Sequence, residues 1–461
     1  MRVLDWFRDR AVRRIVKFGL PVTIGKAATS VAGLIVLALL ARHLGPELFG
    51  VLAVMRTFVT VVDQYANFNT AQALIKFGSD AMMSNRPRDV ERMIKLAVVV
   101  DAATETLAFI VIAGLALVIP HVFSWTHAQG LLCVIYAFTI VTRVTGASDG
   151  IFRICDAYRA AAIATAVGSA ATVIAIAVAV ALDASFGGCV VASMVGEVVS
   201  NLIVTVASLR VARRAGYGGW WRAPLRGVRA TFPGIVRFMV ATNAQLSVKR
   251  THNELDTIVV GSMLGKIPSG LFKVVKQLAT IPGRTFLPFE QVLFTELARL
   301  SAADDDTVFS RVLHRFTMLV LVGSLAIWAV IAIIAEPVIR TVAGAEFIGA
   351  APAFRWYLLA MVLNVANTPV QRAVVALGRP GTLFLFDSAT LVFLAGAVVA
   401  GAKLYGLVGV SIAVVLHKLV QMAWSHWLVA RILRGRAAAR IIAAQDPLRL
   451  PNHVDDTSPV L

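Results

Sequence analysis

Charged residues are scarce in this chain of 461 residues. Asp, Glu, Lys and Arg make up 15% of it and hydrophobic residues 58%, whereas a soluble protein has about 25% charged residues. Residues 160–182 and 318–335 carry no charge at all. A helix needs about 20 consecutive apolar residues to cross the hydrocarbon core of a membrane. The composition therefore excludes an ordinary soluble domain and predicts an all-α polytopic membrane protein.

Cysteine and enzyme motifs are scarce as well. Cys133, Cys155 and Cys189 are widely spaced and form no CxxC motif, so we expect neither a disulfide framework nor a metal site. The chain has no P-loop and no HExxH motif. The acidic run 304–306 is a single Asp-rich motif, whereas a membrane prenyltransferase needs two. We predict a transporter without cofactors or metals, and a membrane-embedded glycan or prenyl transferase remains the alternative from another class.

The apolar runs predict twelve transmembrane helices, with both termini in the cytoplasm. The positive-inside rule supports this orientation, because the connections and tails assigned to the cytoplasm hold 31 Lys and Arg and those assigned outside hold 4. The same bias explains the net charge of +18 without a nucleic-acid partner. The predicted spans are 18–41, 48–75, 96–119, 129–150, 160–182, 185–209, 238–264, 268–298, 313–335, 352–376, 381–402 and 405–430.

The span 238–264 is predicted from an internal repeat, because its many charged residues make its hydropathy too low to identify it as a span. A shift of 220 residues places Leu44-Gly45 on Leu264-Gly265 and Gly50 on Gly270. The repeat predicts two pseudo-symmetric six-helix lobes around a central cavity, an arrangement that recurs in transporters. The predicted parts are residues 1–209 (first lobe), 210–237 (basic cytoplasmic connection), 238–435 (second lobe) and 436–461 (cytoplasmic tail).

Three stretches carry a resemblance to a known family: ALLARHLGPELFGVLAVMRTFV (38–59), RICDAYRA (153–160) and ALGRPG (376–381). They resemble the first loop and two helix starts of the polysaccharide or O-antigen flippase family, in the multidrug/oligosaccharidyl-lipid/polysaccharide (MOP) exporter superfamily. The resemblance covers nearly the whole chain. It implies a flippase of the bacterial cytoplasmic (inner) membrane that moves undecaprenyl-diphosphate-linked oligosaccharide to the outer leaflet by alternating access.

The family resemblance also implies partners of the protein and an alternative function. The product of such a flippase would serve O-antigen, capsule or exopolysaccharide synthesis, with membrane lipids around the protein and a polysaccharide polymerase and chain-length machinery downstream. A drug or metabolite exporter of the same superfamily is the nearest alternative.

Seven cations lie within four helices that the repeat makes equivalent. A diphosphate cannot cross hydrocarbon with its charge unpaired, so a flippase needs cations at membrane depth. These seven are therefore the candidate substrate-binding residues; the competing interpretation is that they form ion pairs that fix helix packing. They are Lys26, Arg56, Lys249, Arg250, Lys273, Lys276 and Arg284.

Acidic residues and a histidine in the same helices are candidates for ion coupling. Burial raises the proton affinity of a carboxylate. Asp63, Glu254 and Asp256 are therefore the first candidates, and Asp101, Glu105 and Glu197 are secondary candidates. His252 lies four residues before Asp256 and is a candidate proton relay. An ion-pairing or helix-capping role is the alternative for each carboxylate.

Overall fold

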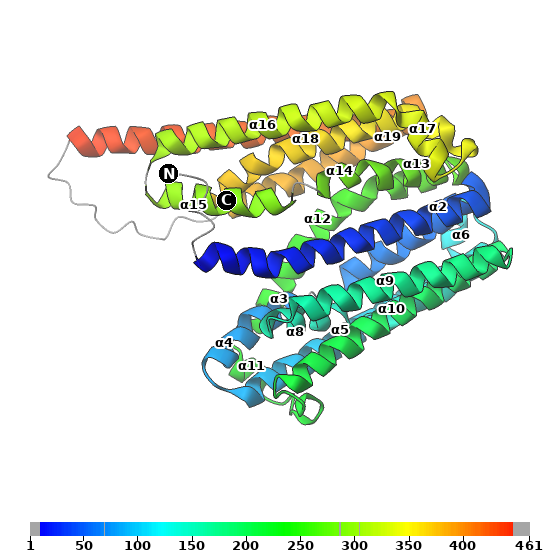
Figure 1. Cartoon of the computed structure of the whole chain (residues 1–461), viewed down its shortest axis with the longest axis horizontal. Helices are drawn as coiled ribbons and strands as arrows, with labels where there is room; N and C mark the ends of the chain where they lie inside the picture. Colours follow the sequence, from blue (N-terminus) through cyan, green and yellow to red (C-terminus); the bar gives the residue numbers. More distant parts are fainter. Residues whose placement is uncertain (1–9, 69, 285–286, 304, 446–461) are drawn as a thin grey trace.

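The computed structural model describes residues 10–68, 70–284, 287–303 and 305–445, and these contain helices and no strands (Figure 1). Eight helices in this part are long and apolar enough to cross a membrane. Two of them, Gly25–Met83 and Gly381–Ala438, contain 59 and 58 residues, which is more than twice the length of about 20 residues that one span needs. The all-α polytopic fold is thus confirmed, whereas the count of twelve spans stays a prediction.

The first lobe is built from five long helices and the short ones between them. Its helices are α2 (Arg10–Ala66), α3 (Thr70–Ala73), α4 (Ser79–Met83), α5 (Pro87–Gly114), α6 (Ile119–Phe123), α7 (His127–Val141), α8 (Thr145–Ile154), α9 (Tyr158–Ala181) and α10 (Phe186–Arg214). Helix α2 turns back on itself at Gly45, whose φ of 67° lies in the left-handed region that favours glycine.

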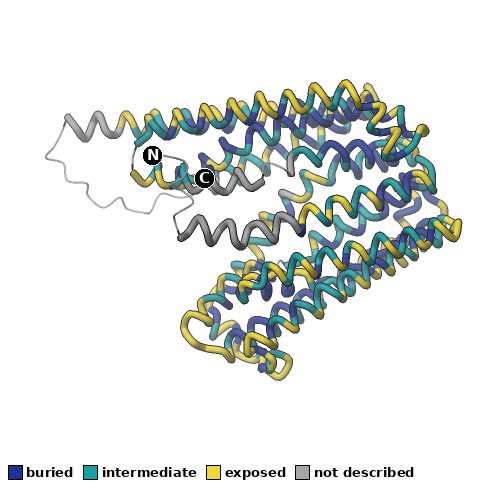
Figure 2. Tube along the Cα trace, viewed as in Figure 1, coloured by how far each residue is buried: buried dark blue, intermediate teal, exposed yellow. Residues whose placement is uncertain are grey.

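The second lobe has the same plan. It consists of α12 (Ile235–Met263), α13 (Lys266–Ala279), α14 (Ile281–Arg284), α15 (Leu287–Ala302), α16 (Asp306–Ile333), α17 (Ala335–Val342), α18 (Ala351–Ala376) and α19 (Pro380–Gln445). Helix α19 reverses at Tyr405 and Gly406. Exposed residues line the outward sides of these helices (Figure 2). On α16 they include Leu319, Val322 and Ile333, which suits a surface facing lipid.

The internal repeat is visible at the point where the lobes meet. Gly45 and Gly265 both have positive φ, 67° and 90°, and each turns the chain between two helices. Gly50 and Gly270 then pack backbone against backbone, so that a Cβ on either one would collide with the other helix. The residues paired by the shift of 220 thus occupy equivalent places at one crossing of α2 and α13.

This crossing closes one end of the molecule, which we call the closed end. It lies opposite the end where the described chain begins and finishes (Figure 1). Lys266 and Glu47 form an ion pair of 3.5 Å there, and the rings of Phe49 and Phe347 make an edge-to-face contact at 6.0 Å. Arg42 donates to the carbonyl oxygen of Thr341 in the second lobe. The lobes diverge from this end toward the termini.

Helix α12 belongs to both lobes, which the predicted boundary at residue 238 did not anticipate. Its first turns pack into the first lobe, where Ile235 and Met239 share a buried cluster with Met93 of α5. Phe238 contacts Phe77 edge to face at 5.7 Å. The rest of α12 packs against α13 and α19, and also against α2 of the first lobe, where Ser247 donates to the carbonyl oxygen of Gln64 at 3.2 Å.

The basic connection 210–237 also docks on the first lobe. It includes α11 (Val228–Thr231). Lys95 donates to the carbonyl oxygen of Ala223 at 2.8 Å, and the backbone N–H of Gly219 donates to Glu91 at 2.8 Å. Trp221 remains 56% exposed beside Arg222. The connection is therefore a fixed part of the first lobe with an exposed basic and aromatic edge.

Candidate functional site

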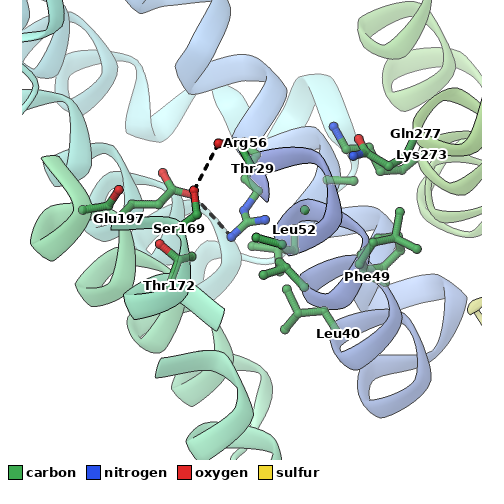
Figure 3. Close-up of a pocket in the computed structure, with 16 residues that line it drawn as sticks. Thr29, Leu40, Phe49, Leu52, Arg56, Ser169, Thr172, Glu197, Lys273 and Gln277 are labelled. Carbon is green, nitrogen blue, oxygen red and sulfur yellow. Dashed lines mark hydrogen bonds and ion pairs between the residues drawn. The ribbon is translucent and has the colours of Figure 1, made fainter. Parts of the chain in front are cut away.

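A cavity of about 270 Å³ lies between the two halves of α2, helices α9 and α10, and helix α13 of the second lobe. It therefore takes wall residues from both lobes (Figure 3). Its apolar wall includes Leu40, Phe49 and Leu52. Its polar wall residues are Thr29, Arg56, Ser169, Thr172, Glu197, Ser200, Lys273 and Gln277.

Arg56 is the cation that the first lobe contributes to this cavity. Its guanidinium lies 3.4 Å from Glu197 of α10 and 5.7 Å from the ring centre of Tyr136 on α7. Tyr136 donates to the same Glu197 oxygen at 2.7 Å. The Arg56 Nη2 atom carries the ion pair with Glu197, whereas its Nε atom is buried and makes no hydrogen bond in the described part of the chain. Arg56 is therefore held in place by Glu197 and keeps an unused donor at Nε.

Lys273 is the cation that the second lobe contributes. It lies on α13, one turn before Gln277, and both line the cavity opposite Arg56 (Figure 3). Among the residues the structure describes, Lys273 makes no hydrogen bond or ion pair within 4 Å, although the carboxylates of Glu254 and Asp256 attract its charge from further away. The two cations Arg56 and Lys273 outnumber the carboxylate Glu197 in the cavity wall, so the cavity keeps a net positive charge that favours an anion.

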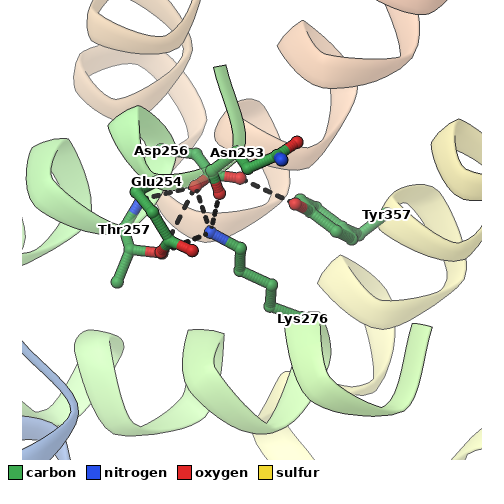
Figure 4. A network of polar contacts seen from close by, with 6 residues as sticks. All are labelled: Asn253, Glu254, Asp256, Thr257, Lys276 and Tyr357. Carbon is green, nitrogen blue, oxygen red and sulfur yellow. Dashed lines mark hydrogen bonds and ion pairs between the residues drawn. The ribbon is translucent and has the colours of Figure 1, made fainter. Parts of the chain in front are cut away.

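Lys276 is one turn further along α13 and is already neutralised. Its Nζ lies 2.9 Å from Asp256 and 3.1 Å from Glu254, and it also donates to Thr257 and to the backbone carbonyl of Asn253 (Figure 4). The other Asp256 oxygen accepts from Tyr357 of α18 at 2.7 Å. This arrangement matches the ion-pair alternative for Lys276, Glu254 and Asp256, which tie α12, α13 and α18 together.

The remaining predicted cations divide into two groups. Lys26 is exposed and precedes the cavity residues Thr29 and Gly33 by three and seven positions, so it lies on the same face of α2, nearer the termini. Arg250 is exposed on α12. The side chains of Lys249 and Arg284 lie outside the described part of the structure.

The predicted ion-coupling residues lie in different places and have different partners. His252 packs on His417 of α19, with ring centres 5.2 Å apart, and its Nδ1 contacts the carbonyl oxygen of Val248. Asp256 takes its hydrogen bonds from Lys276, Thr257 and Tyr357 rather than from His252, so a role of His252 as a proton relay stays a prediction. Asp63 pairs with Arg143 inside the first lobe at 3.0 Å.

Two important residues were missed in the sequence. Arg143 falls inside the predicted span 129–150 and is not among the candidate residues; the structure places it in the break between α7 and α8. An arginine inside a predicted membrane span was the available signal. Tyr357 gave no signal, since a tyrosine among apolar residues is ordinary.

A family model described as polysaccharide biosynthesis protein matches residues 9–301. The chain belongs to this family. It is similar to "Inner membrane protein YghQ" of Escherichia coli (strain K12), with 24% identity over 295 residues, which are 62% of this chain and 82% of that protein. It is also similar to "Teichuronic acid biosynthesis protein TuaB" of Bacillus subtilis (strain 168), with 22% identity over 201 residues, 43% of this chain and 41% of TuaB.

Solved structures share the fold. "Lipid II flippase MurJ, inward closed conformation" superposes with a TM-score of 0.66 at 13% identity, covering 94% of both chains. An inward-facing multidrug resistance MATE family transporter of the MOP superfamily also gives 0.66 at 13% identity, covering 88% of this chain and 96% of that one. The family model thereby confirms a polysaccharide biosynthesis family, and the solved structures confirm the fold.

Proposed function

We propose that the chain is a flippase that moves an undecaprenyl-diphosphate-linked oligosaccharide from the cytoplasmic to the outer leaflet during surface polysaccharide synthesis. The observation that carries this proposal is the pair Arg56 and Lys273, contributed by different lobes to one cavity. The charge bias of the sequence orients the end with the termini toward the cytoplasm. The cavity would then receive substrate from the cytoplasmic side.

The chemistry of the cavity fits an anionic head group. An unpaired diphosphate is strongly excluded from hydrocarbon, and two cations at membrane depth reduce that cost. Arg56 offers directional N–H donors to phosphate oxygens, and Lys273 offers a compact point charge. A cationic drug would meet two cations and one carboxylate, Glu197, in the cavity wall, and this net positive charge argues against the drug-exporter alternative.

The polar neighbours fit the sugar part of the substrate. Ser169, Thr172 and Ser200 present hydroxyl groups from α9 and α10, and Gln277 presents an amide from α13. Such groups exchange hydrogen bonds with sugar hydroxyls at little cost, because both sides are donors and acceptors. Closure of the lobes around the head group, followed by opening of the crossing at Gly50 and Gly270, would complete one transport step.

Reconstituted vesicles test the proposal. A fluorescent undecaprenyl-diphosphate-linked sugar, incorporated in both leaflets, is quenched from outside, and the quenchable fraction is followed with time. We expect wild-type protein to make the labelled lipid of both leaflets accessible to the quencher. The double variant Arg56→Gln/Lys273→Gln should lose this activity. Arg153→Gln and Lys403→Gln serve as matched controls, because Arg153 forms an exposed pair with Asp149 and Lys403 is exposed on α19. Equal flipping by the double variant and the controls would refute the proposal.

A further inference from the structure

The basic connection 210–237 carries seven arginines that are all exposed. They are Arg210, Arg213, Arg214, Arg222, Arg226, Arg229 and Arg237. In the part of the chain that the structure describes, none of their side chains forms a hydrogen bond or an ion pair. No Asp or Glu occurs between Glu197 and Glu254. These arginines, which we call the basic surface, therefore keep their charge available for a partner.

The carboxylates of α5 that border the connection are already engaged. Glu91 accepts from a backbone N–H of the connection at 2.8 Å. Asp89 pairs with Arg86 and with Arg92, each at 3.3 Å. Arg92 in turn donates to the hydroxyl of Thr231 in the connection at 3.4 Å. The acidic groups of α5 thus serve other partners, and the charge of the basic surface is left to be balanced from outside the protein.

Helix α10 shows which way this surface faces. Four exposed apolar residues recur along it at spacings of three and four, so they form one stripe. They are Val195, Val199, Leu202 and Val206, between 39% and 49% exposed. Glu197 and Ser200, which line the cavity, each lie two residues from the stripe, or about 200° around the helix. The stripe is therefore opposite the cavity and faces lipid.

Arginines continue the exposed apolar sides of two helices. Arg210 and Arg213 follow Val206 by four and seven residues, so they extend the stripe of α10. On α12, Arg237 precedes the exposed Val240 by three residues. The connection lies at the end of the first lobe opposite the closed end (Figure 1). The basic surface is thus placed at the level of the lipid head groups, just outside the hydrocarbon.

An exposed tryptophan accompanies the arginines. Trp221 is 56% exposed, and the guanidinium of Arg222 lies 4.3 Å from its ring centre. Tryptophan is enriched where a membrane meets water, because its ring is apolar and its N–H is polar. The contact with Glu91 and the hydrogen bond from Lys95 to Ala223 hold this part of the connection on α5. The tryptophan and its neighbouring arginines therefore move with the first lobe.

We propose that the basic surface binds the anionic head groups of phospholipids in the cytoplasmic leaflet and thereby holds the first lobe to that leaflet. Guanidinium groups bind phosphate oxygens through paired hydrogen bonds. The seven arginines are spread along the connection and none of them lines the cavity, which suits several lipid molecules rather than one substrate. Each basic residue near an anionic membrane raises the affinity roughly fivefold, and salt screens this attraction. Such lipid binding is independent of the proposed function.

Titration of the purified full-length protein with soluble lipids tests this binding. A fluorophore attached through Ala230→Cys, at an exposed position of α11, reports the binding after the native cysteines are replaced. In about 50 mM NaCl, we expect dioctanoyl-phosphatidylglycerol to bind at least about tenfold more tightly than dioctanoyl-phosphatidylcholine. The preference should fall several-fold in about 500 mM NaCl, which tests its electrostatic origin without any variant.

Two double variants separate the basic surface from positive charge in general. Arg222→Gln/Arg226→Gln removes two unpaired arginines, and we expect it to lose about tenfold of the preference. Arg86→Gln/Arg153→Gln removes two arginines that already pair with aspartates, and it should keep the preference. Equal affinity of wild type for the two lipids, or an equal loss in the two double variants, would overturn the proposal. Farnesyl phosphate and dioctanoyl phosphatidic acid both carry a phosphate monoester, so tenfold tighter binding of farnesyl phosphate would overturn the proposal in favour of a site for a polyprenyl carrier.

Discussion

The crossing of Gly50 and Gly270 allows a quantitative prediction about alternating access. In Gly270→Ala the new methyl group would collide with the backbone carbonyl of Pro46, which cannot rotate away as a flexible side chain could. Overpacking of this kind costs about 1–3 kcal/mol. The collision exists only in the conformation in which the lobes touch at the closed end. The equilibrium should therefore shift by about 5- to 150-fold toward the conformation in which the lobes are separated there.

Spin-label distances measure this shift. Labels at Asp183 and Arg340, which are exposed near the closed end on different lobes, report its opening after the native cysteines are replaced. We expect a longer distance component in Gly270→Ala. Gly323→Ala on α16 is the control, because its methyl group would meet nothing within 4 Å. An unchanged distribution in Gly270→Ala would refute the view that this crossing is the closure.

Two further predictions concern stability. Asp256→Asn removes one carboxylate from the network around Lys276, and breaking a buried pair costs about 3–5 kcal/mol. Tyr357→Phe loses one hydrogen bond worth about 1 kcal/mol. Thermal unfolding in detergent should therefore show a larger loss of stability for Asp256→Asn than for Tyr357→Phe, and the reverse order would contradict the network. Asp305 caps α16, and the hydrogen bond from the Val308 N–H lowers the pKa of its carboxyl group. Its contribution should be present above the ordinary carboxyl range near pH 4 and lost as pH falls through the lowered pKa. The stability difference between wild type and Asp305→Ala should therefore shrink on acidification, and a constant difference would show that the cap is not ionised.

Periodic and local features of the sequence predicted most of the architecture. The apolar runs located the long helices, and the shift of 220 residues identified Gly45 with Gly265 and Gly50 with Gly270, because turn and crossing glycines are demanded by local backbone geometry. The repeat did not reveal that α12 packs its first turns against the other lobe. That packing depends on contacts of Ile235 and Met239 with distant helices.

The roles of the charges were harder to predict, since each depends on partners far away in the chain. Lys273 and Lys276 are three residues apart and look equivalent in the sequence. The rotation of α13 points one into the cavity and the other at Glu254 and Asp256. Arg56 and Glu197 are likewise brought together only by the packing of α2 against α10. Charge at membrane depth therefore located candidate residues, and it could not show which of them are already paired with carboxylates.

Binding of the lipid-linked substrate to purified protein tests the central claim most directly. Affinities are compared for an undecaprenyl-diphosphate-linked sugar and its neutral undecaprenyl analogue, with wild type, Arg56→Gln, Lys273→Gln and the Lys403→Gln control. We predict that wild type prefers the diphosphate and that each cavity variant loses about tenfold or more of this preference, since a charge-assisted hydrogen bond contributes about 1.5–3 kcal/mol. Equal affinity for the diphosphate and the neutral analogue in wild type, or an unchanged preference in both cavity variants, would contradict the account.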